Sequence, residues 1–514
     1  MKNQLFPFRN IQVNSFFDFL VSKRFLYLIS AISVIGFLIT LKNRYIYIDD
    51  AWFGEQAFWF SKDGIPRTAS LKDFFEWDKH LLVYHKLNII LGAGIIKVFG
   101  WSVNNLRITT IIIFSIFLCI FYRYHRANGE KLHSRDFSLL LFFFLVNPIL
   151  ISLVFTYRPE ILVMLFGFLS WINLEVFLDN KKTWRLALAG IFSGLAFLTH
   201  MNGLIFSIAG VILLLYNRKF MPFLLFSIVT GAIASLFFYD LWQPGRLEMF
   251  LFQMREWPDP VGSNWISNNA FGYVWNVLRK LSSEHQRFFW SYKVWMSSVF
   301  FFLALIPFFR SQFKENKNLL IYTISLVIAL NVFGSQIAER FLIYLFPYMA
   351  LIFLFGIEKL RQKKYPVLKV LFSMAILLQI AFSTAMVVTI LSKNKDFVQM
   401  HTQALSKIPP QSGIVLADYP FVFNGLETHD LISFKLFEYL EVSEKMKYNL
   451  ETFTDKANSL GVKYIIFPEG KEQFENRDYS YLFDNVADIP HYELFLVSDG
   501  YKFYRSISLN DKPN

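Results

Sequence analysis

Runs of apolar residues recur along most of this chain, and they constrain its fold more than any other feature. About eleven runs are long enough, or nearly so, to cross a bilayer. They lie near residues 25–41, 104–122, 137–157, 160–179, 186–200, 203–216, 220–239, 294–309, 319–335, 341–357 and 366–391. Hydrophobic residues make up 54% of the 514 residues and charged residues only 18%, unlike an ordinary soluble domain. We therefore predict an α-helical polytopic membrane protein.

The basic residues predict its orientation. They lie in alternate short loops: Arg123, Arg126, Lys131 and Arg135; Lys181, Lys182 and Arg185; Arg218 and Lys219; Arg310, Lys314 and Lys317; Lys359, Arg361, Lys363 and Lys364. If the N-terminus is cytoplasmic, all these loops lie on the cytoplasmic side, as the positive-inside rule requires. Much of the net charge of +12 is then a topology signal and does not indicate a nucleic-acid partner. We expect an inner (plasma or cytoplasmic) membrane protein whose long polar segments, 42–103, 240–292 and 392–514, are extracytoplasmic.

The last of these segments has the pattern of a small α/β domain. Short buried strands are predicted at 413–417 and 463–467, with a helix at 452–460 between them. Asp499-Gly500 joins two alternating runs and predicts a hairpin. We expect a transmembrane domain over 1–391 and a soluble extracytoplasmic domain over 392–514, in which no catalytic motif is found.

Two adjacent carboxylates, Asp49 and Asp50, follow the first apolar run at the level of the lipid headgroups. Acids beside anionic lipid phosphates are unfavourable unless they act on a cation or a substrate proton. The pair therefore indicates an active site, although a solvated acidic turn remains the alternative. His85 and Lys86 follow at the start of a short apolar stretch, where the lysine suits a phosphate or simply extends to the interface. His80, His85 and an acid would make only a weak metal site, since their spacing fits no common motif.

Several motifs in a fixed order resemble the GT-C glycosyltransferases, which include protein O-mannosyltransferases and lipid A aminoarabinose transferases. After the acidic pair they are Asn105-Leu106-Arg107, Tyr157-Arg158-Pro159-Glu160, the Gly194–Gly203 stretch that contains Leu198-Thr199-His200, and Glu339-Arg340-Phe341-Leu342 with Leu345-Phe346-Pro347. The match covers roughly residues 25–360. Three positions depart from the family pattern: Asp50 replaces a glutamate, His85-Lys86-Leu87 replaces Lys-Pro-Pro, and His200 replaces a lysine.

The resemblance implies transfer of a sugar from a polyprenyl-phosphate-linked donor to an acceptor hydroxyl on a lipid, glycan or protein. Asp49 would be the base, with Asp50 beside it and Glu160 as a third catalytic acid. Arg158, Lys86, His85, Arg340 and His200 would bind substrate, with the arginines suited to the departing phosphate. Direct attack would invert the anomeric centre, and the sequence leaves open a divalent metal ion.

Some of these residues also fit purely structural roles, and other functions fit the chain. Arg158 and Glu160 would also suit a rigid turn with an ion pair, and His200 would suit a structural hydrogen bond. A lipid-linked glycan ligase or polymerase is an alternative function. A transporter or flippase is another, but it predicts internal repeats around a midplane site, and we find no repeat.

Overall fold

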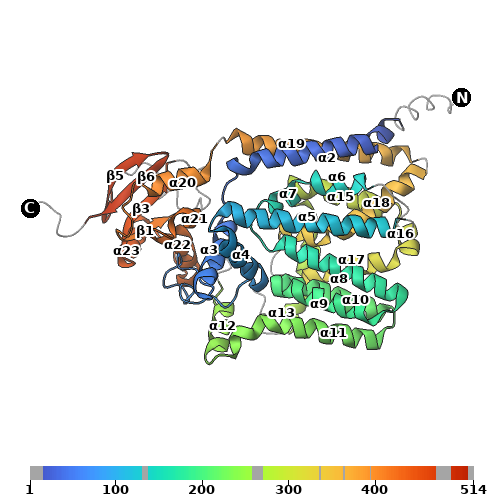
Figure 1. Ribbon diagram of the computed structural model, residues 1–514, viewed down its shortest axis with the longest axis horizontal. Helices are drawn as coiled ribbons and strands as arrows, with labels where there is room; N and C mark the ends of the chain where they lie inside the picture. Colours follow the sequence, from blue (N-terminus) through green and yellow to red (C-terminus); the bar gives the residue numbers. More distant parts are fainter. Residues whose placement is uncertain are drawn as a thin grey trace, which may run out of the picture.

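Long helices lie side by side and form a bundle that ends in a small β-sheet region (Figure 1). In this computed structural model the described residues are 15–129, 137–257, 270–334, 337–362, 365–393, 395–469 and 488–507. Four predicted loop cations, Lys131, Arg135, Lys363 and Lys364, lie outside them. The helical bundle confirms the predicted class of fold.

Each predicted apolar run coincides with helical structure. The principal helices are α2 (Lys23–Ile39), α5 (Val103–Ala127), α8 (Glu160–Asn180), α9 (Thr183–Thr199), α10 (Leu204–Tyr216), α11 (Phe220–Ala234), α15 (Tyr292–Leu305), α17 (Lys317–Phe333), α18 (Phe346–Gln362) and α19 (Pro366–Ser392). Within the described ranges, six stretches are long and apolar enough to cross a membrane, or up to eight if each of two bent pairs is one span. The expected number of about eleven spans stays a prediction.

One apolar run is broken into two helices, and two neighbouring runs are joined by a short turn. The run at 137–157 breaks into α6 (Ser138–Leu145) and α7 (Pro148–Val154), since Pro148 cannot continue the helical hydrogen bonds. Asn147 caps α7 and donates to Ser297 Oγ at 2.6 Å. Between α9 and α10, which match the separate runs 186–200 and 203–216, the chain makes a short 3-10 turn, Met201–Gly203. A side chain at Gly203 would collide with the backbone of Ala196, only 2.2 Å from the Cβ position.

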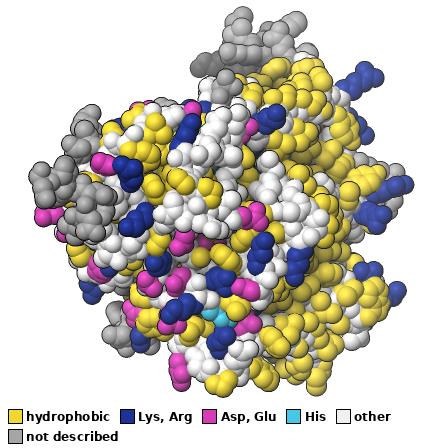
Figure 2. Space-filling view, turned by 60° about the vertical axis from the view of Figure 1, so that its left-hand side comes forward, with side chains coloured by type: hydrophobic (Ala, Val, Ile, Leu, Met, Phe, Trp, Pro, Cys, Tyr) yellow, Lys and Arg dark blue, Asp and Glu magenta, His cyan; other side chains and the backbone are white. Residues whose placement is uncertain are grey.

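The bundle has two unlike ends. Helices α3 (Ile48–Asp63), α4 (Lys86–Phe99) and α12 (Arg246–Arg255) lie at the end that carries the sheet, called here the α3 end (Figure 1). Helix α16 (Phe309–Glu315) and the start of α2 lie at the opposite end (Figure 1). Figure 2 shows a broad hydrophobic band with Lys and Arg side chains along its outer edge, and charges of both signs on the face beyond the band. This arrangement is typical of a protein that spans a bilayer.

The C-terminal region forms one mixed sheet with helices. Its strands are β1 (Ile414–Ala417), β2 (Asp430–Ser433), β3 (Val462–Pro468), β4 (Asp488–Ile489), β5 (Tyr492–Ser498) and β6 (Tyr501–Ser506), in the order β2-β1-β3-β6-β5-β4. Strand β1 is parallel to β2 and β3, and the remaining pairs are antiparallel. The hairpin expected at Asp499-Gly500 is confirmed, and both residues have the positive φ that a primed turn needs.

Apolar side chains of the sheet region and of the first long loop belong to one hydrophobic cluster. The cluster contains Phe53 of α3 and Trp77 of the loop together with Tyr419, Phe434 and Ile465 from the C-terminal region. The rings of Phe74 and Tyr439 stack with their centroids 5.6 Å apart. The sheet region is therefore packed directly against the elements at the α3 end.

Candidate active site at the α3 end

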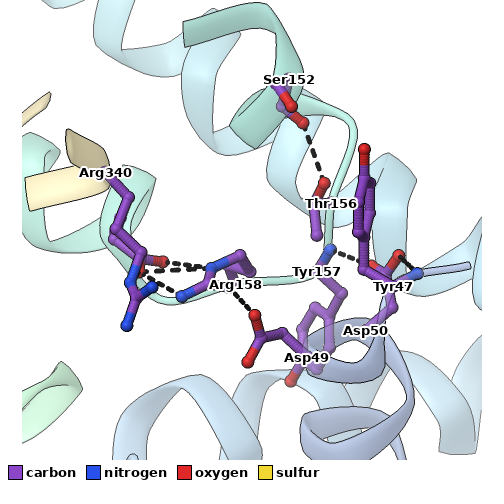
Figure 3. Close-up of polar contacts among 9 residues, drawn as sticks. Tyr47, Asp49, Asp50, Ser152, Thr156, Tyr157, Arg158 and Arg340 are labelled. Carbon is purple, nitrogen blue, oxygen red and sulfur yellow. Dashed lines mark hydrogen bonds and ion pairs between the residues drawn. The ribbon is translucent and has the colours of Figure 1, made fainter. Parts of the chain in front are cut away.

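The two adjacent carboxylates have different environments. Asp50 is fully buried, and its oxygens accept hydrogen bonds from Arg107 at 2.6 Å and from the backbone N–H of Tyr157 at 2.5 Å. The Asp49 side chain is 37% exposed and forms an ion pair with Arg158 (Figure 3). Adjacent helical residues face in different directions, so the start of α3 presents Asp49 to the site and turns Asp50 into the protein.

Arg158 joins the acids of two helices. It lies in the turn before α8. Its Nη2 donates to Glu160 Oε1 at 2.7 Å, and its Nη1 donates to Asp49 Oδ2. Burial alone would lower the pKa of Arg158, but Asp49 and Glu160 outweigh it and hold that pKa above its usual range. Arg158 is therefore a fixed cation between the two carboxylates.

Arg340 completes a row of alternating charges. It lies in η4 (Glu339–Leu345), and its Nε is 3.7 Å from Oε1 of Glu160 (Figure 3). The Glu160 side chain is only 1% exposed, whereas that of Arg340 is 37% exposed. Thus Asp49 and Arg340, at the two ends of the row, are accessible, and Arg158 and Glu160 form its buried centre.

A pair of histidines lies beside this row. The rings of His85, which precedes α4, and His200, which ends α9, are stacked 4.3 Å apart at 18°. Burial lowers the pKa of His85 to about 4, although the nearby Glu160 opposes the shift. His200 Nδ1 accepts the backbone N–H of Asn202 at 2.9 Å, which leaves Nε2 as the protonated nitrogen of a neutral ring. Neutral stacked rings of this kind can offer hydrogen bonds to sugar hydroxyls.

Lys86 is held by a carboxylate that the sequence did not point to. Its Nζ is 2.5 Å from Oδ2 of Asp240, which also accepts from the Tyr84 hydroxyl at 3.1 Å. The ammonium lies 4.0 Å from the centre of the Tyr84 ring. Burial lowers the pKa of Lys86, and Asp240 opposes that shift. The positive charge of Lys86 is thus already balanced by Asp240, which lies in η3 (Ser235–Trp242).

The structure therefore groups the predicted site residues in three sets. Asp49, Arg158, Glu160 and Arg340 form the row, His85 and His200 form the adjoining pair, and Asp50 and Lys86 each engage another partner. Those partners, Arg107 and Asp240, were missed as site residues. Their signal in the sequence is a charge inside or at the end of an apolar run, where ionisable groups are usually functional or paired.

The donor set does not fit a metal ion. Among the described residues, no group of three or more His, Cys, Asp or Glu side chains could hold one. The two carboxylates of the row, Asp49 and Glu160, are both directed at the Arg158 guanidinium.

Comparison with solved structures identifies the fold. The chain superposes on ArnT from Cupriavidus metallidurans bound to undecaprenyl phosphate with a TM-score of 0.60 at 10% identity, over 96% of this chain and 100% of that one. Its superposition on the apo state of that protein has a TM-score of 0.56 at 13% identity, covering 95% and 99%. This chain has the GT-C fold.

An archaeal structure supports the same conclusion. The Archaeoglobus fulgidus oligosaccharyltransferase tethered with an acceptor peptide matches with a TM-score of 0.52 at 14% identity, over 87% of this chain and 70% of that one. No protein-family model and no curated protein matches the sequence. Because folds host many chemistries, the function has to be argued from the site.

Proposed function

We propose that this protein is a membrane glycosyltransferase that moves a sugar from a polyprenyl-phosphate-linked donor to an acceptor hydroxyl. The observation that carries the proposal is the row Asp49–Arg158–Glu160–Arg340, with an accessible carboxylate at one end and an accessible guanidinium at the other. A base and a phosphate-binding cation are the two groups that such a transfer needs. The structural neighbours support the donor class, since ArnT was solved with undecaprenyl phosphate and the archaeal enzyme AglB with a dolichol-phosphate.

The proposed reaction is a direct displacement. The acceptor oxygen attacks the anomeric carbon, the bond from that carbon to the phosphate oxygen breaks, and the bonding electrons leave with the phosphate. Asp49 takes the proton of the acceptor hydroxyl, and the Arg340 guanidinium meets the charge that develops on the phosphate. Attack from the face opposite the leaving group inverts the anomeric centre.

The remaining residues have supporting roles in this proposal. Glu160 orients both arginines, and Arg158 holds Asp49 in place. His85 and His200 supply hydrogen bonds to the sugar, and Asp50 fixes the Tyr157-Arg158 turn through the Tyr157 N–H. Lys86 meets the donor phosphate if that phosphate displaces Asp240. The acceptor is a hydroxyl of a glycan, lipid or protein.

We place the site on the extracytoplasmic side of the inner membrane. The α3 end carries the long polar segments, whereas α16 and its basic residues Arg310 and Lys314 lie at the opposite end. The positive-inside rule assigns that opposite end to the cytoplasm. The division between 1–391 and 392–514 is part of the same proposal, since α19 ends at Ser392 and every strand in the described residues follows it.

The test is sugar transfer by purified protein supplied with a panel of undecaprenyl-phosphate-linked hexoses and pentoses and with lipid, glycan and peptide acceptors. The Asp49→Asn variant removes the base and keeps the shape, so turnover should fall by about two to four orders of magnitude. Asp63→Asn is the matched control, because Asp63 is on the same helix and pairs with Arg67 away from the row. Parental turnover in Asp49→Asn would contradict the proposal. Movement of the donor across a vesicle bilayer without transfer would favour a flippase.

A further inference from the structure

A second carboxylate of α3, Glu55, is fully buried and faces the C-terminal region. Its Oε2 accepts hydrogen bonds from the Tyr419 hydroxyl at 2.7 Å and from the Ser70 hydroxyl at 2.5 Å, and its Oε1 accepts the Ser70 N–H at 2.9 Å. Burial raises the pKa of Glu55, and the hydrogen bonds from Ser70 and Tyr419 oppose that shift. We call these three residues the Glu55 junction, because they join α3, the first long loop and the sheet region.

Two further contacts strengthen this junction. A side chain at Gly54 would have its Cβ only 2.7 Å from the Phe423 ring, so α3 and α21 (Val422–Gly425) approach as closely as a glycine allows. The backbone N–H of Ser433 donates to the Ser70 carbonyl at 2.9 Å. One face of α3 and its neighbouring loop are thus held by backbone and side-chain groups of the C-terminal region.

The edge of the sheet that makes these contacts is unusual for its fold. Tyr419 follows the end of β1, and Ser433 ends β2, so both lie at the carboxyl end of parallel strands. In open α/β sheets this edge is where ligands generally bind. Here the edge packs on α3 and the first long loop, so it contacts the helix bundle where other sheets of this kind contact a ligand.

The same helix carries Asp49, whose negative charge acts on a side chain of the C-terminal region. The pKa of Tyr439 in α22 (Phe434–Glu444) is raised by burial, by Glu438 and by the negative charge of Asp49. Helix α3 is therefore fixed on one side by Asp50 with Arg107, and on another by Glu55 with Tyr419. Asp49 therefore begins a helix that is held both by the helix bundle and by the C-terminal region.

We infer that the C-terminal region is a positioning element for Asp49, and that Glu55 and Tyr419 are the positioning residues that transmit its hold on α3. This inference rests on the proposed function, because Asp49 is the base in that function. The cations of the row come from other elements, the turn before α8 and η4. Loss of the junction should therefore displace the base and leave donor binding largely intact.

The experiment compares Glu55→Leu, Glu55→Gln and Tyr419→Phe in purified full-length protein. A displacement of about 1 Å can cost roughly 100-fold in rate, so Glu55→Leu should lower kcat by about 10- to 100-fold and change the KM for the donor by less than about twofold. Glu55→Gln should retain most of the activity, since its amide oxygen still accepts the Ser70 N–H and hydroxyls can turn to accept from its amide nitrogen. Tyr419→Phe should cause a smaller loss of kcat, about 3- to 10-fold by the same reasoning.

Tyr448→Phe is the matched control, because the Tyr448 hydroxyl donates to Glu444 at 2.9 Å, within the C-terminal region. Amide hydrogen exchange of α3 gives a readout that needs no activity: it should speed up in Tyr419→Phe and not in Tyr448→Phe. If Glu55→Leu does not fold, Tyr419→Phe and its control still decide the question. Parental kcat in Tyr419→Phe and Glu55→Leu, or an effect confined to KM, would overturn the inference. If α3 exchanges faster in Tyr419→Phe than in Tyr448→Phe but the parent protein transfers no sugar, the proposed function is overturned instead.

Discussion

At the scale of single residues, burial separates side chains that look equivalent in the sequence. Asp49 and Asp50 are neighbours of the same type and each pairs with an arginine, yet only the Asp50 carboxylate is itself fully buried. A buried carboxylate is stabilised by its cation and its N–H donors, whereas a half-exposed one is partly stabilised by water. The exposed acid is the one that can meet a substrate.

The two acids should therefore differ in their effect on stability. Asp50→Asn leaves Arg107 buried without a counter-charge, which should lower the free energy of unfolding by about 3–5 kcal/mol. Asp49→Asn should change it by less than about 1 kcal/mol, since partly exposed ion pairs contribute little. Thermal unfolding in detergent, followed by tryptophan fluorescence, measures both variants. Equal melting temperatures for the two variants would show that Asp50 is not the structural member of the pair.

At the scale of elements, α4 is positioned by close contact with the turn that carries Arg158. The Tyr157 hydroxyl donates to the carbonyl of Asn88 at 2.6 Å. The Cβ of any side chain at Gly92 would lie only 2.0 Å from that hydroxyl oxygen. The glycine therefore sets the distance between α4, which follows His85, and the turn that precedes α8.

Two glycines of α4 allow a matched test of this packing. Gly92→Ala should push Tyr157 away from Asn88, lowering the melting temperature and the rate of sugar transfer together. Gly94→Ala should stabilise the helix by up to about 1 kcal/mol, because nothing lies within 4 Å of its Cβ position and alanine favours helix over glycine. Melting curves and transfer assays on the two variants measure the contrast. A Gly92→Ala protein that behaves like Gly94→Ala would rule out the close contact.

At the scale of the whole molecule, the two ends of the bundle differ in charge and in the length of their connections. Helix α16, which contains Arg310 and Lys314, lies at one end, and the α3 end carries the site and the sheet region (Figure 1). We expect the potential membrane spans to separate the proposed chemistry from the cytoplasm.

Labelling of single cysteines tests this orientation in intact cells. In a Cys119→Ser background, Ser443→Cys in the C-terminal region should react with a membrane-impermeant maleimide once the outer surface of the inner membrane is accessible. Lys182→Cys, between α8 and α9, should react only after the membrane is permeabilised, because its basic loop is expected to be cytoplasmic. The reverse pattern of labelling would reverse the proposed sidedness.

Several features followed from the sequence because they depend on residues close together in the chain. Apolar runs of membrane length gave the helices, including the separate runs 186–200 and 203–216, whereas the break at Pro148 within the run 137–157 was not predicted. The Asp499-Gly500 turn gave the hairpin, since the local backbone preference of such a pair does not depend on the rest of the fold. The ordered motifs pointed to the GT-C fold before any tertiary contact was known.

The partners of the charged groups were decided by tertiary structure alone. Arg107, Asp240 and Tyr419 lie far along the chain from Asp50, Lys86 and Glu55, and no local pattern links them. A buried charge needs a counter-charge or hydrogen-bond donors, but packing determines which distant group is near enough to supply them. The sequence by itself determined that this is a helical membrane protein with charges placed for chemistry. Only the folded chain decided which of those charges face the site and which hold it together. A charged side chain loses its water only where the folded chain buries it, and it then needs a partner.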